Sequence, residues 1–131
     1  LAEFLLQKGY EVHGLIRSRA RFDASPLAPL AARLHLHEGD LGDPTLAQTI
    51  VALQPDELYH LAAQTHVAPS LSDPVPTLDY NILGTARLLE ACRTAPRRPK
   101  FFHASSSLIF GQPTTAPQDE STPFRPVNPY G

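Results

Sequence analysis

Residues 34–63 read LHLHEGDLGDPTLAQTIVALQPDELYHLAA and contain the pattern strand, helix, strand. The short run Leu34–His37 predicts the first strand, and the apolar run Leu58–Ala63 predicts the second. Between them, Asp43 at the N-cap and Pro44 at the first helical position predict a helix over residues 44–53. Two strands joined by a helix pair in parallel, so this stretch predicts a parallel sheet.

The same alternation continues on both sides of this stretch. We predict helices over 1–8 and 77–94, strands over 12–16 and 101–105, a loop with a short helix over 17–33, and a proline-rich loop up to Tyr130. Helices that alternate with apolar strands indicate an α/β fold, a doubly wound parallel sheet of the Rossmann type. Ligands bind such sheets at the carboxyl ends of the strands, so the residues after each strand are the candidates for a site.

The composition fits one globular domain. The chain has 131 residues, a net charge of −2, 42% hydrophobic residues and 18% charged residues, which excludes a disordered tail and a strongly basic nucleic-acid binder. It has no apolar run long enough for a membrane span, no signal-peptide pattern and one cysteine, Cys92. We therefore expect a soluble, cytoplasmic protein with neither a membrane nor a nucleic-acid partner.

The ends of the sequence lead to a further expectation. The chain contains no methionine and opens within an amphipathic pattern. We expect an internal piece of a longer protein, with residues 1–131 forming a partial NAD(P)-binding Rossmann domain. Its first strand and its C-terminal substrate lobe would lie outside these residues.

Basic residues follow the strand predicted over 12–16. Arg17, Arg19 and Arg21 occur there, and no acidic residue is present before Asp23. A dinucleotide-binding fold has at this point the group that contacts the ribose 2′ position, where an acid favours NAD. Guanidinium groups suit the 2′-phosphate of NADP instead. The alternative is a solvated basic loop.

Other candidates follow the next two strands. Asp40 could accept a hydrogen bond from an adenine amino group, with Leu41 against the ring, or Asp40 could simply start a turn. Ala62 and Ala63 have small side chains, which allow a ligand to approach the backbone closely. Two polar residues at the mouth of the same site are Gln64 and His66, although a lone histidine is more often structural.

Hydroxyl groups follow the last predicted strand. Ser106 lies in Ala104–Ser107 and could either hydrogen-bond the backbone of a turn or point at a substrate. Its expected partner is Tyr130, 24 residues later. His35 and His37 share one face of a strand, but two ligands do not make a metal site, and we assign none.

Several segments, in this order, resemble the extended short-chain dehydrogenase/reductases that act on nucleotide sugars, and the GDP-mannose 4,6-dehydratase family in particular. The similarity covers nearly the whole chain. The matching segments are GYEVHG at 9–14, GDL at 39–41, QPDELY at 54–59, AQTHV at 63–67, GTARLLEA at 84–91, ASSS at 104–107 and TPFRP at 122–126.

The resemblance implies a role for each candidate. Tyr130 would be the base that takes a proton from the sugar 4-hydroxyl, and Ser106 would hydrogen-bond the same oxygen. The implied cofactor is NADP, the implied substrate is GDP-mannose, and the implied assembly is a homo-oligomer. The implied cofactor contacts are Arg17, Arg19, Asp40, Leu41, Ala62, Ala63 and Tyr130, and the implied substrate contacts are Gln64, His66 and Ser106.

The implied reaction oxidises C4, eliminates water across C5 and C6, and returns the hydride to C6. One position departs from the family pattern, because Leu108 stands where the dehydratases carry a glutamate that removes the C5 proton. A 4-epimerase or 4-keto-reductase needs no such group and is the alternative, and a non-catalytic nucleotide-binding homologue is the second. The family's glycine-rich loop and its lysine after the tyrosine would lie outside these residues, so we expect the 131-residue chain alone to be inactive.

Overall fold

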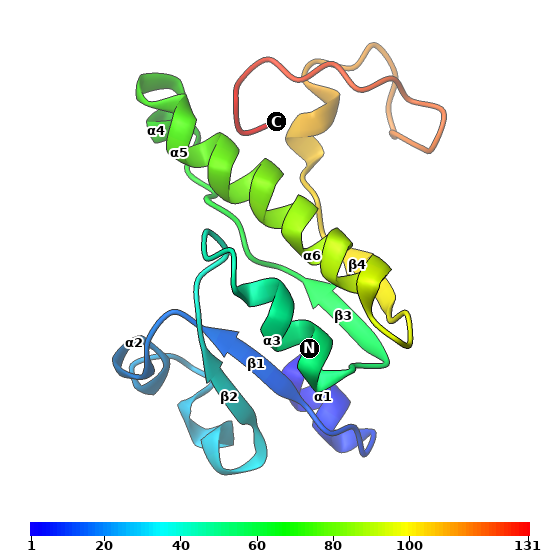
Figure 1. Cartoon of the computed structure of the whole chain (residues 1–131). Helices are drawn as coiled ribbons and strands as arrows, with labels where there is room; N and C mark the ends of the chain where they lie inside the picture. The colour runs from blue at the N-terminus through cyan, green and yellow to red at the C-terminus, as the bar shows by residue number, and fades with distance from the viewer. The chain divides into compact units, whose positions relative to one another are not determined.

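The computed structural model describes residues 1–131, which form two compact units, Leu1–Asp43 and Pro44–Gly131 (Figure 1). Each unit combines helices with one pair of parallel strands. The expected α/β fold with parallel strands is therefore confirmed, whereas a single Rossmann domain over 1–131 stays a prediction. None of the helices has the length and apolar character that crossing a membrane requires.

The first unit is built on the strand pair β1–β2, which is parallel and in register. His13 lies opposite His35, and Ile16 lies opposite Glu38. Since both strands run the same way, the residues after Ile16 and after Glu38 leave the sheet at the same edge. The elements of this unit are α1 (Ala2–Gln7), β1 (His13–Ile16), α2 (Arg19–Asp23), the 3₁₀ helix η1 (Ala28–Arg33) and β2 (His35–Glu38).

The second unit is built on the parallel pair β3–β4, with Glu57 opposite Lys100 and His60 opposite His103. Helices α3 and α6 pack against each other (Figure 1) and carry most of its buried apolar side chains, Leu46, Leu88, Ala91 and Cys92. The elements are α3 (Leu46–Leu53), β3 (Glu57–His60), α4 (Val67–Ser72), α5 (Pro74–Leu78), η2 (Asp79–Leu83), α6 (Gly84–Thr94), β4 (Lys100–His103) and the 3₁₀ helix η3 (Ser107–Phe110).

The helix predicted over 77–94 is a longer, interrupted helix. It starts at Pro74 and runs through α5, η2 and α6 without a break in the chain, and η2 is a π-helical turn. Such turns insert an extra residue into a helix and occur frequently at functional sites. Asn81 lies in this turn.

Predicted boundaries of α3, β3 and β4 were wrong, and β4 covers Lys100–His103 instead of 101–105. Helix α3 has its N-cap at Thr45 instead of Asp43, because Asp43 belongs to the preceding turn, in which its N–H donates to Asp40 O at 2.9 Å. Strand β3 ends at His60 instead of Ala63, because its partner β4 ends at His103 and the last bond runs from Ala104 N to His60 O. Helices α4 and η3 were not predicted, since α4 has Pro69, a helix-breaking signal, at its third residue and η3 has only four residues.

Candidate functional site at the strand ends

Two of the predicted cofactor residues that follow β1 and β2 lie side by side. Arg17 Nε is 3.6 Å from Asp40 Oδ2, and both side chains are about half exposed. Asp40 Oδ1 also accepts a hydrogen bond from Gly42 N at 2.8 Å, which holds the carboxylate in a tight turn. A guanidinium and a carboxylate therefore meet at the carboxyl ends of the strand pair.

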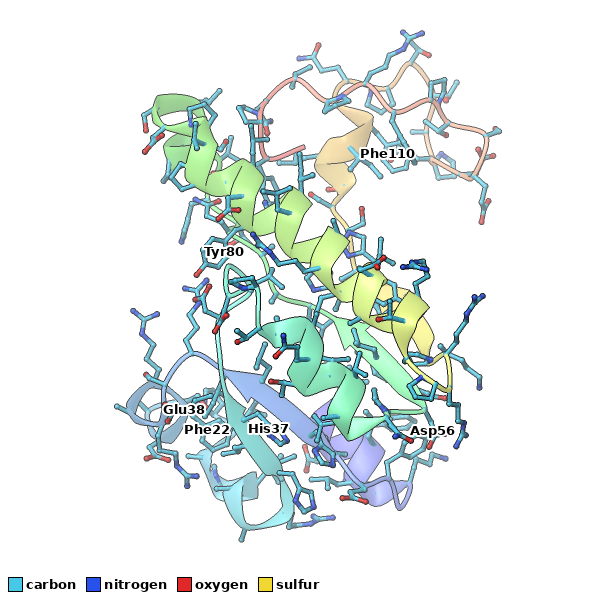
Figure 2. The ribbon with its side chains drawn as sticks, in the orientation of Figure 1. Phe22, His37, Glu38, Asp56, Tyr80 and Phe110 are labelled. Carbon is cyan, nitrogen blue, oxygen red and sulfur yellow. The ribbon has the colours of Figure 1, made fainter.

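The second predicted arginine is held within its own helix. Arg19 Nε donates to Asp23 Oδ1 at 3.0 Å, and the guanidinium lies over the Phe22 ring at 5.7 Å from its centre. Its backbone N–H donates to Glu38 Oε1 at 3.0 Å; Figure 2 labels Phe22 and Glu38. The charge of Arg19 is thus partly neutralised by Asp23, and Arg17 is the arginine beside the candidate adenine contact.

Leu41 is a buried residue. Its exposed fraction is 4%, so its side chain offers little surface to a ligand. An adenine contact at this position would have to use the edge of the side chain or the backbone. The predicted role of Leu41 stays a prediction.

The loop after β3 is fastened to the π-helical turn by one asparagine. Asn81 Oδ1 accepts from Gln64 N at 2.9 Å, and Asn81 Nδ2 donates to Gln64 O at 3.1 Å. Both backbone groups of Gln64 are therefore paired, which fixes the end of the segment that contains Ala62 and Ala63. Sequence reasoning missed Asn81; the available signal was an asparagine in a helix interior, where this residue is disfavoured.

The side chain of Gln64 contains an unsatisfied hydrogen-bond acceptor. Its Oε1 atom is buried and has no hydrogen-bond partner. A buried carbonyl oxygen left unpaired costs about 1–3 kcal/mol, and a hydroxyl or N–H of a ligand would remove that cost. His66, the other predicted substrate contact, is exposed at the N-cap of α4, and its side chain makes no capping bond.

The end of β3 is fixed by a second, buried chain of hydrogen bonds. Thr85 Oγ1 donates its only proton to Asn81 O at 2.6 Å, so it accepts from His60 Nε2–H at 2.9 Å. Burial lowers the pKa of His60, and the nearby His103 lowers it further. The hydrogen bonds place a proton on His60 Nε2, and burial favours the neutral form of the ring.

The turn after β4 presents the predicted catalytic serine. Ser105 has a positive φ of 56°, a backbone conformation that non-glycine residues rarely adopt and that clusters at functional sites. Ser106 follows as the N-cap of η3, and its Oγ accepts from Leu108 N at 3.1 Å. Because Oγ accepts in this bond, the hydroxyl proton is still available to donate to another group.

The proline-rich loop returns the other predicted catalytic residue to η3. Arg125 N donates to Ile109 O at 2.9 Å, and the Phe110 and Phe124 rings meet edge to face at 5.6 Å between centres. Gly131 lies against η3 so closely that a Cβ there would be 2.6 Å from Leu108 O. Tyr130 is the residue before Gly131, so the chain brings it back to the turn that Ser106 begins; Figure 1 shows the C-terminus beside this short helix.

Leu108 has no carboxylate near it in the sequence. The side chain is half-buried on η3, and no acidic residue occurs between His103 and Asp119. Phe110, labelled in Figure 2, lies on the same short helix. Helix η3 therefore supplies hydroxyl and backbone groups but no carboxylate.

The sequence is similar to that of a known family and its members. A profile of the family described as GDP-mannose 4,6 dehydratase matches residues 1–131. The chain is 46% identical over 133 residues to the GDP-mannose 4,6-dehydratase sdnI of Sordaria araneosa, an alignment that covers 99% of this chain and 24% of the relative.

The structure was compared with solved structures. It resembles the UDP-glucose 4-epimerase of Brucella ovis, solved in complex with NAD, with a TM-score of 0.81 and 28% identity over 98% of this chain. It also resembles RMD of Pseudomonas aeruginosa, solved with NADPH, with a TM-score of 0.64 and 35% identity over 79% of this chain. The chain spans 24% of the length of the fungal relative and 38% of each solved chain.

Proposed function

Because this chain belongs to the GDP-mannose 4,6-dehydratase family, we propose that the whole protein is an NADP-dependent enzyme that removes water from GDP-mannose. The reaction oxidises C4, eliminates water across C5 and C6, and returns the hydride to C6. The observation that carries the proposal is the close approach of Gly131 to Leu108, because it brings Tyr130 to the Ser106 turn.

The strand-end residues fit a nicotinamide dinucleotide. Arg17 can pair with the 2′-phosphate, and the neighbouring Asp40 can accept from the adenine amino group. The small side chains of Ala62 and Ala63 leave room for a ligand against the backbone. The unpaired Gln64 Oε1 can accept a hydrogen bond from a donor group of the ligand. NADP, when bound, would supply the hydride acceptor for C4 and the hydride donor for C6.

Two hydroxyl groups act at C4 of the sugar in this proposal. Tyr130 takes the proton of the 4-hydroxyl, and the Ser106 hydroxyl donates a hydrogen bond to the same oxygen while keeping its proton, since Ser106 Oγ already accepts from Leu108 N. Gln64 and His66 would contact the sugar nucleotide near the end of β3. Removal of the C5 proton needs a base from outside η3, because leucine cannot move a proton.

A second function is favoured by Leu108. A 4-epimerase or 4-keto-reductase oxidises or reduces only at C4, so Ser106, Tyr130 and the cofactor suffice. The likeness to the Brucella ovis 4-epimerase is consistent with this alternative. Dehydration remains the proposal because the family match extends over all 131 residues.

The test uses the whole protein as its gene encodes it, incubated with NADP and GDP-mannose, with the product analysed by mass spectrometry. We expect a product lighter by one water molecule. Tyr130→Phe should lower kcat at least about hundredfold, because it removes the general base. The matched control is Tyr10→Phe, at an exposed tyrosine remote in sequence from η3, which should keep full activity.

Other products would overturn the proposal. An epimer of unchanged mass on this or another nucleotide sugar would establish the 4-epimerase or 4-keto-reductase instead. No turnover of any nucleotide sugar, despite tight NADP binding, would establish a non-catalytic homologue.

We also propose that the whole protein self-associates. Exposed apolar side chains gather on α5 and η2, where Val75 is 69% and Ile82 is 60% exposed, with Leu78 and Leu83 beside them. Such a patch is typical of an interaction surface. Light scattering should report an oligomer that Val75→Lys dissociates, whereas Leu27→Lys, at an exposed leucine of the first unit, should leave it intact.

A further inference from the structure

One cluster of side chains has no part in the proposed reaction. It consists of His13, His35 and His37 on the strand pair of the first unit, and of Glu11 in the segment before β1. In a strand, alternate residues share a face, so His35 and His37 point the same way. Glu11 lies two residues before β1, and its Oε1 is 3.2 Å from His13 Nε2. The register places His13 opposite His35, which brings the three histidines to one face of the pair; Figure 2 labels His37 on β2.

The spacing of three of these side chains matches a metal site. Glu11 Oε1 lies 3.2 Å from His13 Nε2 and 3.5 Å from His35 Nε2, and one ligand atom from each residue lies within 4.8 Å of the others. Ligands bound tetrahedrally to Zn²⁺ at 2.0–2.1 Å are separated by about 3.3–3.4 Å. His35 is 58% exposed, so its ring can rotate and bring its ligand nitrogen closer to the ligand atoms of Glu11 and His13.

The fourth member of the cluster orients one of the ligands. His13 Nδ1 is 2.9 Å from His37 Nε2, and the two rings are stacked with 9° between their planes. When Nε2 of His13 binds a metal, its Nδ1 carries the ring proton. The Nδ1–H group then donates a hydrogen bond to His37 Nε2. A ligating histidine almost always has such a partner, which fixes its tautomer and its ring orientation.

We propose that Glu11, His13 and His35 bind one divalent transition-metal ion, Zn²⁺, with His37 as the positioning residue for His13. Two imidazoles and one carboxylate suit Zn²⁺ and its first-row neighbours, whereas Mg²⁺ and Ca²⁺ prefer oxygen ligands alone. A solvent molecule completes the coordination, because the cluster is open to water.

The site is separate from the proposed cofactor end of the same strands. His13 opens β1, and Arg17 follows four residues later, about 13 Å along an extended chain. The ion would therefore join β1, β2 and the segment before β1 without touching the cofactor. The proposal does not depend on the enzymatic activity.

The test is calorimetric titration of the whole protein with ZnCl₂, after treatment with a chelator. We expect one Zn²⁺ per chain with micromolar or tighter affinity. Glu11→Gln and His35→Ala should each weaken binding at least tenfold, and His37→Ala should weaken it about tenfold through the lost partner of His13. Glu11 is 71% exposed, so Glu11→Gln removes a ligand without disturbing the packing.

The matched control is His103→Ala, which removes an exposed histidine from the strand pair of the second unit and should leave the affinity unchanged. Circular dichroism should show that every variant keeps its fold. The proposal would be overturned if the unchanged protein bound no Zn²⁺ at one per chain. It would equally be overturned if Glu11→Gln and His35→Ala bound Zn²⁺ as tightly as His103→Ala.

Discussion

The two strand pairs of this protein carry the same motif in different surroundings. In β1–β2, His13 lies opposite His35, with ring centres 4.8 Å apart; in β3–β4, His60 lies opposite His103 at 5.0 Å. The first pair is open to water beside Glu11, whereas His60 is 4% exposed and bonded to Thr85. In both cases the strand register brings two imidazoles together. Their chemical role depends on burial and on the neighbouring side chain, which is Glu11 in the first pair and Thr85 in the second.

The largest expected effect is the difference in folding stability when one histidine is removed from each strand pair. His60→Ala removes a buried ring and leaves the Thr85 hydroxyl without its donor, so it should lower the free energy of unfolding by about 3 kcal/mol. His35→Ala removes an exposed ring and should change it by less than about 0.5 kcal/mol in the absence of metal. Urea unfolding of both variants measures the difference, and equal losses would show that the two pairs do not differ in this way.

The next effect concerns the carboxyl ends of β1 and β2, where the two arginines differ. Arg17→Ala should raise the Kd for NADP about tenfold while leaving the Kd for NAD nearly unchanged, because only NADP carries the 2′-phosphate. Arg19→Ala should have a smaller effect, since Arg19 is already bonded to Asp23. Fluorescence titration with both cofactors measures these constants; a larger loss in Arg19→Ala would reverse the assignment.

The smallest effect is a pH dependence from His60. Its pKa is lowered in the folded protein, so the unfolded chain binds more protons once the pH falls below about 6.5. The free energy of unfolding should therefore fall as the pH falls through that window, by at most about 1.4 kcal/mol per pH unit.

The matched variant for this pH dependence is His60→Gln, which keeps a donor for Thr85 but does not titrate. Its unfolding free energy should depend less on pH below 6.5 than that of the unchanged protein. Identical profiles for His60→Gln and the unchanged protein would remove His60 as the source of the pH dependence.

Local signals in the sequence predicted the order of the main elements and the pairing of parallel strands. The turn residues around α3 and Gly9, which has a φ of 82° after α1, are signals of this kind. The same reasoning selected Ser106 and Tyr130, because both lie after β4 in the sequence and match residues of the family that the chain resembles.

The missed features depend on partners far apart in the chain. Asn81 pairs with Gln64 seventeen residues away, and His13 meets His35 only through the register of two strands. No local pattern encodes such a register. The sequence therefore showed two histidines on one face of β2, whereas the structure adds His13 and Glu11 beside them.

The central claim is dehydration by a protein that has Leu108 in place of an acid. The most direct test runs the reaction of the whole protein with NADP and GDP-mannose in D₂O. Elimination across C5 and C6 breaks the C5–H bond, and the proton that later returns to C5 comes from solvent. We predict a product that has lost one water molecule and carries deuterium at C5. A product of unchanged mass, or one without deuterium at C5, would contradict this account.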